Sequence, residues 1–292
     1  MTGAGRQLEV VRPGALTTVQ DDGRPGLAHL GVPRSGSLDR AAHHLANRLV
    51  ANPESAPVLE TTIDGVGVVA RCDVEVAVTG ALADVSVDGG AADWGVPVRL
   101  RAGQRLEVGR ARAGVRSYVA AAGGIVVAET LGSASRDVLS ELGPPPLGAG
   151  DRLALGPPGA PAPAIDMSPY PVPAGEVELL LHEGPRSDWL SDAGWATLAT
   201  GRWSVSSDSN RVALRLQGPA VQRARREELA SEGIVLGAVQ SLPDGGLVIF
   251  LADHPTTGGY PVVAVVGPAS LSACAQARPG TEVRFRMVAV RR

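Results

Sequence analysis

The chain has no lysine: all 27 of its basic residues are arginine. A P-loop needs a lysine for its nucleotide phosphates, and Schiff-base chemistry needs a lysine amine, so both are excluded. Covalent biotin or lipoyl arms are also attached to lysine, so the chain carries neither. A GC-rich genome would favour arginine codons and so give the same bias, but the chemical exclusions hold in either case.

Aromatic side chains are also scarce, at 3% of the residues, and the net charge is only -3. Neither property favours a nucleic-acid partner. The two cysteines, Cys72 and Cys274, lie far apart in sequence, which predicts buried free thiols in a reducing compartment. No apolar run approaches the ~20 residues that span a bilayer, and the N-terminus has no apolar signal core. We therefore expect a cytoplasmic protein without a membrane partner.

Proline divides the chain into two parts. With 292 residues, 44% of them hydrophobic, the chain can form two ordinary domains. Prolines cluster around residues 157–173, where no apolar period is present, and this pattern predicts a stiff linker. We expect an N-terminal β domain with a glycine-rich loop and one helix at 1–160, a linker at 161–173 and a C-terminal β-barrel at 174–292.

Short strand-like segments dominate both halves. Alternating valines predict strands in the first half, and a helix is expected over 39–50 with Ser37 or Asp39 as its N-cap. Short helices are also expected at about 186–198 and 270–277. Regular strand–helix alternation is missing, so a mainly β fold of two antiparallel barrels or sandwiches is predicted. The expected strands are 66–79, 85–87, 98–108, 115–120, 177–182, 203–206, 212–216, 247–252, 262–266 and 283–290.

The segment Gln20–Asp39 is rich in glycine and has neither helical nor strand periodicity. A loop of this length is uncommon in a compact domain unless it has a function. Arg24 and Arg34 could hold a carboxylate, phosphate or carbamoyl group, and the loop leads into the start of the expected helix, which favours an anion. The alternative is an arginine–aspartate network that only fixes the loop.

A second glycine-rich segment, Ala252–Pro261, reads A-D-H-P-T-T-G-G-Y-P and follows an apolar strand. Its paired glycines allow close approach of the backbone to a ligand, and its acid, hydroxyls and tyrosine supply donors and acceptors. A tight turn between two strands is the alternative interpretation.

Several familiar sites are missing from the sequence. The five histidines form no H-E-x-x-H or comparable pair, so no dedicated metal site is expected. There is no G-x-S-x-G nucleophile elbow. The charged run Arg223–Glu228 is interpreted as a solvated, self-paired surface, with a partner contact as the alternative.

Together these segments resemble one family over nearly the whole chain: the C subunit of 5-oxoprolinase, also called allophanate hydrolase subunit 2 or biotin-dependent carboxyltransferase domain proteins. Three departures bear on substrate specificity and leave membership intact: Asn210–Ala213 in place of D-R-M-G, Ser135–Asp137 in place of an S-T-like pair after Leu131–Ser133, and His254-Pro255 before Thr256. The motifs that carry the resemblance are Gln20–Arg24, Gly31–Asp39, Asn47–Asn52, Leu59–Thr62, Tyr118–Gly124, Leu131–Ser133, Asp208–Gly218, Ser231–Gly233, Gly237–Gln240, Asp244-Gly245 and Asp253–Pro261.

The resemblance implies cyclophilin-like β-barrels and a working complex with two separate proteins, the B and A subunits of 5-oxoprolinase. That complex uses ATP to open 5-oxo-L-proline to L-glutamate. Our leading hypothesis is therefore a non-carrier subunit of 5-oxoprolinase that is inactive alone, with ATP used at the level of the complex and the position of its site left open. A biotin-dependent urea carboxyltransferase half is the second hypothesis. A non-enzymatic regulator that binds a kinase inhibitor is the third.

Candidate site residues come from both glycine-rich segments. Arg24 would orient an anionic or polarised group, and Asp253 would accept a proton or position water. Because both lie in loops, we expect little loss of packing when either is substituted. The catalytic candidates are Asp21, Arg24 and Asp253, and the substrate-binding candidates are Ser35, Gly36, Asp39, Glu232, Gln240, Thr257, Gly258, Gly259 and Tyr260.

Overall fold

A computed structural model describes residues 5–159 and 175–288 and divides them into two units. The first unit holds the residues up to Arg24, Asp39–Asp137, and the described residues from Glu141 to 159. The second holds Pro25–Leu38, Val138–Ser140 and the second described range. Two loops from the first half of the chain thus belong to the second unit, and the predicted linker 161–173 lies outside the described residues.

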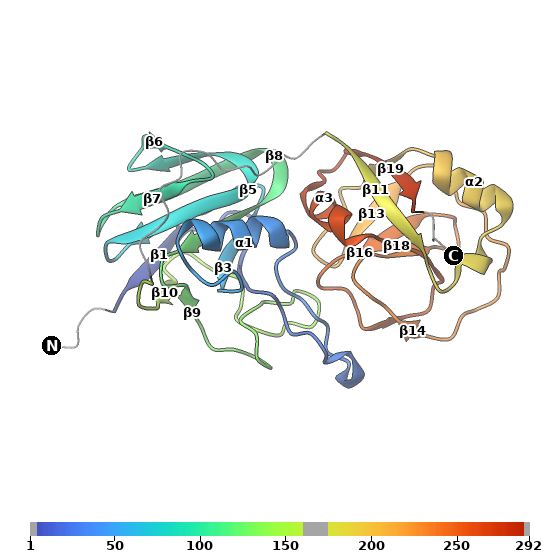
Figure 1. The fold of residues 1–292 in the computed structure, drawn as a ribbon, viewed down its shortest axis with the longest axis horizontal. Coiled ribbons are helices and arrows are strands. Elements are labelled where there is room, and N and C mark those ends of the chain that lie inside the picture. Colours follow the sequence, from blue (N-terminus) through green and yellow to red (C-terminus); the bar gives the residue numbers. More distant parts are fainter. Residues whose placement is uncertain (1–4, 160–174, 289–292) are drawn as a thin grey trace. The chain divides into compact units, whose positions relative to one another are not determined.

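The first unit is one curled sheet of ten strands with a helix packed on it (Figure 1). Two long strands, β5 (Val74–Val87) and β8 (Arg105–Ala121), form its largest antiparallel pair. The main path runs β2-β3-β8-β4-β1-β10-β9, and β5 also pairs with β6 and β7. The remaining strands are β1 (Gln7–Arg12), β2 (Thr17–Gln20), β3 (Val58–Thr62), β4 (Gly67–Ala70), β6 (Gly90–Ala92), β7 (Pro97–Leu100), β9 (Ile125–Val126) and β10 (Arg152–Leu155).

Helix α1 (Arg40–Leu49) begins where the sequence predicts. Asp39 is the N-cap, and its carboxylate accepts a hydrogen bond from the Ala42 amide at 3.2 Å. The helix buries Leu45 and Leu49 in the core of the first unit. The side of the helix that faces the sheet therefore follows directly from its apolar spacing.

The second unit is a closed seven-stranded barrel, in the order β11-β18-β15-β16-β13-β12-β19. All pairs are antiparallel except β11 with β19, which pair in parallel and close the barrel. The mainly β prediction is confirmed. The strands are β11 (Glu176–Glu183), β12 (Trp203–Val205), β13 (Ala213–Gln217), β15 (Ala238–Ser241), β16 (Leu247–Phe250), β18 (Val262–Val266) and β19 (Glu282–Met287).

Shorter elements surround the barrel. Helix α2 (Asp192–Thr200) is capped by Ser191, and α3 (Leu271–Gln276) follows a single 3₁₀ turn, η3 (Pro268–Ser270). Two further 3₁₀ turns are η1 (Ala28–Leu30) and η2 (Ser187–Trp189). A separate two-stranded ribbon joins β14 (Glu232–Gly233) to β17 (Thr257–Gly258). Within the described ranges no helix is both long and apolar enough to cross a membrane.

Alternation along the barrel strands separates two apolar clusters. Leu214, Val239 and Ile249 belong to the barrel core, whereas Val248 and Phe250 belong to a smaller cluster. Successive side chains of a strand point to opposite faces, so the smaller cluster lies on the outer face of β13, β15 and β16. The pocket described below is on this outer face.

Two predicted strands each span two observed strands. The expected strand at 66–79 is β4 and the start of β5, separated by a bend at residues 71–73. The expected strand at 98–108 is β7 and the start of β8, separated by a turn in which Gly103 has a φ of +91°. Only glycine adopts that conformation readily, so Gly103 marks a turn that apolar alternation alone does not reveal. The expected burial of both thiols holds for Cys274, whereas Cys72 is half-buried.

Candidate functional site

Asp21 fixes the loop that follows residue 130. Its Oδ1 accepts hydrogen bonds from the Gly23 amide and the Ser133 hydroxyl, each at 2.7 Å, and its Oδ2 accepts from the Ala134 amide at 2.7 Å. Its own amide donates to Ser135 Oγ at 2.9 Å. A carboxylate that accepts several charge-assisted hydrogen bonds is held rigidly. Asp21 therefore positions backbone within the first unit.

Arg24 also holds the loop at residues 130–135 in place. Its side chain is only 2% exposed, and its guanidinium donates to the carbonyl oxygens of Thr130, at 3.2 Å, and Ser135. Arginine in this setting ties two backbone segments together. The expectation that substitution costs little packing is wrong for Arg24, because its side chain is buried although the following residues Pro25 and Gly26 are exposed.

Asp39 connects helix α1 to a buried polar chain. Its amide donates to the Tyr118 hydroxyl at 2.7 Å, and that hydroxyl donates to Glu60 Oε2 at 2.8 Å. Burial raises the pKa of Tyr118 well above its ordinary value, and the nearby charges of Glu60 and Asp39 add to the shift. Tyr118 is therefore a neutral donor at physiological pH. The hydrogen bonds from Asp39 to Tyr118 and from Tyr118 to Glu60 fix the start of the helix against β3 and β8.

In the second unit, Asp253 is the centre of a buried ion pair. Its carboxylate takes a bidentate pair of hydrogen bonds from Arg211, with Nε to Oδ2 at 2.8 Å and Nη2 to Oδ1 at 3.1 Å. Ser35 Oγ donates to Oδ1 at 2.8 Å, and the Val138 amide donates to Oδ2 at 3.0 Å. The side chains of Asp253 and Arg211 are 0% and 2% exposed. Substitution of Asp253 therefore also affects packing, contrary to the expectation from its loop position.

This cluster joins the two glycine-rich segments. Ser35, at a φ of +53°, donates its amide to the Ala252 carbonyl at 3.1 Å, and Arg211 Nη2 donates to the Gly36 carbonyl at 2.7 Å. Sequence reasoning selected Ser35, Gly36 and Asp253 and missed Arg211. The resemblance includes Arg211 in a matched segment, but nothing in the sequence indicates that this arginine is buried beside an acid.

The β14–β17 ribbon carries three more candidates. Glu232 pairs with Gly258 in register, and Gly233 pairs with Thr257. A hydrogen bond from Arg186 holds the pKa of Glu232 below its ordinary value. Glu232 is thus an ionised group on the surface whose charge Arg186 balances.

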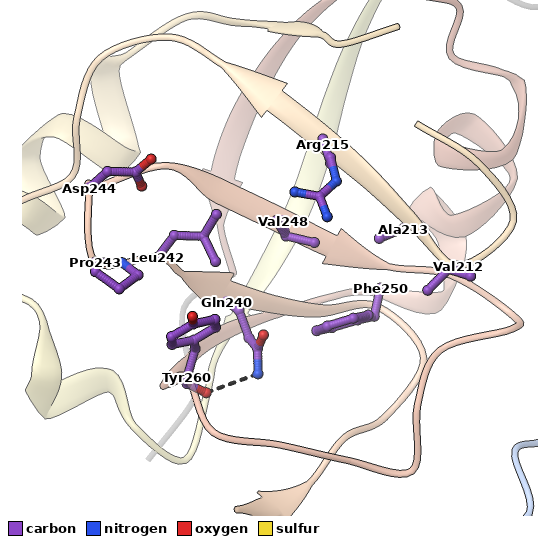
Figure 2. A pocket seen from close by; sticks show the side chains of 10 residues that line it. All are labelled: Val212, Ala213, Arg215, Gln240, Leu242, Pro243, Asp244, Val248, Phe250 and Tyr260. Carbon is purple, nitrogen blue, oxygen red and sulfur yellow. Dashed lines mark hydrogen bonds between the residues drawn. The ribbon is translucent and has the colours of Figure 1, made fainter. Parts of the chain in front are cut away.

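A pocket of about 580 Å³ lies on the outer face of the barrel (Figure 2). Small-molecule sites are commonly ~300–1,000 Å³ with an apolar lining and few polar groups. Arg215 of β13 is opposite Val248 of β16, which is opposite Gln240 of β15, so the three side chains form a row on one face. The pocket is lined by Val212, Ala213, Arg215, Gln240, Leu242, Pro243, Asp244, Val248, Phe250 and Tyr260.

The polar side chains that line the pocket differ in their exposure and in their contacts. Gln240 is 3% exposed and donates its side-chain amide to the Tyr260 carbonyl at 2.9 Å, which leaves its carboxamide oxygen as an acceptor on the pocket side (Figure 2). Tyr260 is 45% exposed, with the Arg223 guanidinium 5.9 Å from its ring centre. Arg215 is exposed, and within the described residues its guanidinium has no ion-pair partner. Sequence reasoning found Gln240 and Tyr260 but missed Arg215.

The candidates therefore form separate groups. Gln240 and Tyr260 share the pocket, and a Cβ on Gly258 would lie 3.0 Å from the Gln240 amide nitrogen, so the ribbon adjoins the pocket side chain. A Cβ on Gly259 would make only an ordinary contact, with the Leu229 carbonyl oxygen 3.5 Å away. Asp21 and Arg24 share the loop of the first unit.

Known proteins now identify the fold. The sequence model of one protein family, the carboxyltransferase domain, subdomain A and B, matches residues 30–287. The chain belongs to this family. The resemblance seen in the sequence is thus confirmed.

Relatives within the carboxyltransferase family are named for two different reactions. The chain is 35% identical to the C subunit of 5-oxoprolinase from Escherichia coli, over 95% of this chain and 90% of that protein. It is 32% identical to urea amidolyase of Lachancea kluyveri, over 95% of this chain and 17% of that protein. The solved urea carboxylase of Kluyveromyces lactis superposes with a TM-score of 0.89 at 30% identity, over 98% of this chain and 28% of that one.

Proposed function

We propose that this chain is the C subunit of an ATP-dependent 5-oxoprolinase, which opens 5-oxo-L-proline to L-glutamate together with the A and B subunits. The observation that carries the proposal is the match to the Escherichia coli C subunit, which extends over 90% of that protein. The absence of lysine supports a non-carrier role, with ATP bound at the level of the complex.

The chemistry of the outer-face pocket supports a small amide acid as its ligand. 5-Oxoproline has a carboxylate, a lactam N–H and a lactam carbonyl. Arg215 offers a cation for the carboxylate, the Gln240 carboxamide oxygen offers an acceptor for the N–H, and the Tyr260 hydroxyl offers a donor for the carbonyl. The apolar floor formed by Val248 and Phe250 suits the methylene groups of the ring.

In this proposal the buried acids and arginines act by positioning. Asp253 and Arg211 hold the loops that carry Ser35 and Gly36, and Asp21 and Arg24 hold the loop at 130–135. Rigid support of this kind keeps a site within the narrow geometric range that catalysis requires.

Reconstitution tests the proposal. The purified chain, incubated with ATP and 5-oxoproline, is expected to give no glutamate, and addition of the A and B subunits is expected to restore ATP-dependent glutamate formation. Arg215→Ala should raise the KM for 5-oxoproline at least ten-fold, because the substrate carboxylate loses its partner. Arg286→Ala is the matched control: this exposed barrel arginine pairs with Glu178 and does not line the pocket.

The alternative function has a distinct outcome. Urea-dependent carboxyl transfer from a biotinylated carrier protein, without glutamate formation, would assign the chain to the urea carboxylase branch. Glutamate formation by the chain alone would contradict its role as one part of a larger enzyme. An unchanged KM for Arg215→Ala would remove the pocket from the proposal and leave the family role intact.

A further inference from the structure

Three side chains that carry metal-ligand atoms meet in the first unit. Asp22, in the loop after β2, lies against His43 and His44 of α1, and one ligand atom from each lies within 4.8 Å of the others. His44 Nε2 is 2.8 Å from Asp22 Oδ1, and His43 Nδ1 is 4.0 Å from the same oxygen. The sequence search for histidine pairs missed this group, because its acid precedes the helix by a long loop.

The hydrogen bond of His43 fixes which of its nitrogens can bind a cation. Nε2 lies 2.8 Å from the Ala56 carbonyl oxygen, which can only accept, so Nε2 carries the hydrogen. Nδ1 then carries the lone pair of the ring, and it lies 4.0 Å from Asp22 Oδ1. A backbone carbonyl on the far nitrogen is the partner that orients metal-bound histidines in proteins.

The atoms of His44 and Asp22 that point away from the proposed ion also have charged partners. His44 Nδ1 is 3.5 Å from Glu54 Oε2, and this acid can hold the ring proton when Nε2 binds a metal. Asp22 Oδ2 is 3.1 Å from Arg40, so Oδ1 is the oxygen that faces the histidines.

The spacing fits a small divalent ion. Bonds of ~2.0–2.1 Å in a tetrahedral arrangement place two ligand atoms about 3.3 Å apart. The two separations from Asp22 Oδ1, 2.8 and 4.0 Å, lie on either side of that value, and all three ligand atoms lie within 4.8 Å of one another, so side-chain rotations are needed to bring them to a common bond length. The side chains of Asp22 and His44 are 31% and 21% exposed, which leaves a solvent side for a fourth ligand.

We propose that Asp22, His43 and His44 bind one divalent transition-metal ion of the Zn²⁺ class, with water as the fourth ligand. Two imidazoles and one carboxylate are typical zinc ligands, and three protein ligands with an open fourth position characterise sites that are not purely structural. The proposal concerns the first unit alone and does not depend on the reaction assigned to the chain.

Calorimetric titration of the chelator-treated full chain with Zn²⁺ tests this site. We expect one ion bound per chain, together with a rise in melting temperature. His44→Ala and Asp22→Asn should each weaken Zn²⁺ binding at least ten-fold and remove most of that rise, because each deletes one ligand. His29→Ala, which removes an exposed histidine from the second unit, is the matched control and should bind Zn²⁺ like the wild type.

Circular dichroism of the metal-free variants establishes that each is folded; if His44→Ala is not, the more conservative Asp22→Asn decides. Absence of Zn²⁺ binding by the wild type at micromolar concentration would overturn the proposal. It would also be overturned if His29→Ala weakened binding as much as the ligand variants did, since the ion would then bind elsewhere. Neither result bears on whether the chain supports glutamate formation.

Discussion

At the scale of single residues, the buried Arg211–Asp253 pair couples several contacts to one carboxylate. Both side chains are almost fully buried, and removal of one partner from such a pair leaves a charge without compensation in a medium of low polarity. The Ser35 hydroxyl and the Val138 amide also depend on the same carboxylate. Two loops of the second unit are therefore coupled to one ion pair.

We predict that Asp253→Asn lowers the free energy of unfolding by about 3 kcal/mol, because the neutral amide cannot balance Arg211. Urea denaturation measures the change. The control is Glu178→Gln, which breaks the exposed pair with Arg286 and should cost less than about 1 kcal/mol. Equal stability of Asp253→Asn and the wild type would show that the pair is not coupled to the fold.

The sequence shows which residue types are present more readily than it shows which residues contact one another in the folded protein. Asp39 was identifiable as an N-cap because a cap is local to its helix. Arg211 and Arg215 were not selected, since the first depends on an acid 42 positions away and the second on pairing across neighbouring strands. The metal-ligand group was missed for the same reason: its members meet only after the loop folds against α1.

At the scale of elements, the curl of the first sheet depends on Gly80. The residue has a φ of +86°, and the register of β5 against β8 shifts just beyond it. A Cβ at this position would overlap the Arg116 carbonyl oxygen and the Tyr118 ring. Glycine is therefore required here for its conformation and for the close approach of β8.

Gly80→Ala is predicted to lower the free energy of unfolding by more than about 3 kcal/mol, since left-handed strain adds to a backbone overlap. Gly89→Ala is the matched control, because Gly89 has a φ of +81° but no heavy atom within 4 Å of its would-be Cβ. That variant should lose only about 1–2 kcal/mol. Thermal melts of the two proteins compare the effects, and equal losses would mean that the contact with β8 is unimportant.

Strand boundaries show where sequence patterns are insufficient. Apolar alternation located six of the seven barrel strands, missing β15, but in the first unit it missed β1, β2, β3, β6, β9 and β10. Two further errors concern β8: alternation joined β7 to its start and separated its two ends. Glycines with positive φ explain both errors: Gly103 forms a turn, whereas Gly114, at +80°, lies within a continuous bent strand. The same residue type ends one strand and bends another, and only pairing with neighbours distinguishes the two cases.

At the scale of the whole molecule, the mainly β architecture and the family were predictable because both depend on patterns spread along the chain. The closed barrel of the second unit was also expected. The assignment of residues 25–38 and 138–140 to that unit was not, since it depends on hydrogen bonds such as Ser35 to Asp253. Loops carry little periodic signal, so their placement is decided by long-range contacts.

Association with the B subunit of 5-oxoprolinase is the prediction at this scale. A stable interface should bury at least ~1,200 Å², so the two proteins should co-elute in size exclusion at micromolar concentration and moderate salt. Arg225→Glu combined with Arg226→Glu should leave co-elution unchanged, because Arg225 is paired with Asp188 at 2.7 Å on an exposed surface. Separate elution of the two wild-type proteins would contradict the complex.

The parallel pairing of β11 with β19 has a consequence for biosynthesis. Glu176 at the start of one strand pairs with Glu282 at the start of the other, so β11 lacks this neighbour until the ribosome has released β19. Every strand of the first unit is translated before then. Pairing between such distant segments is slow. The first unit can therefore fold during translation, while the open edge of β11 needs protection from aggregation until the barrel closes.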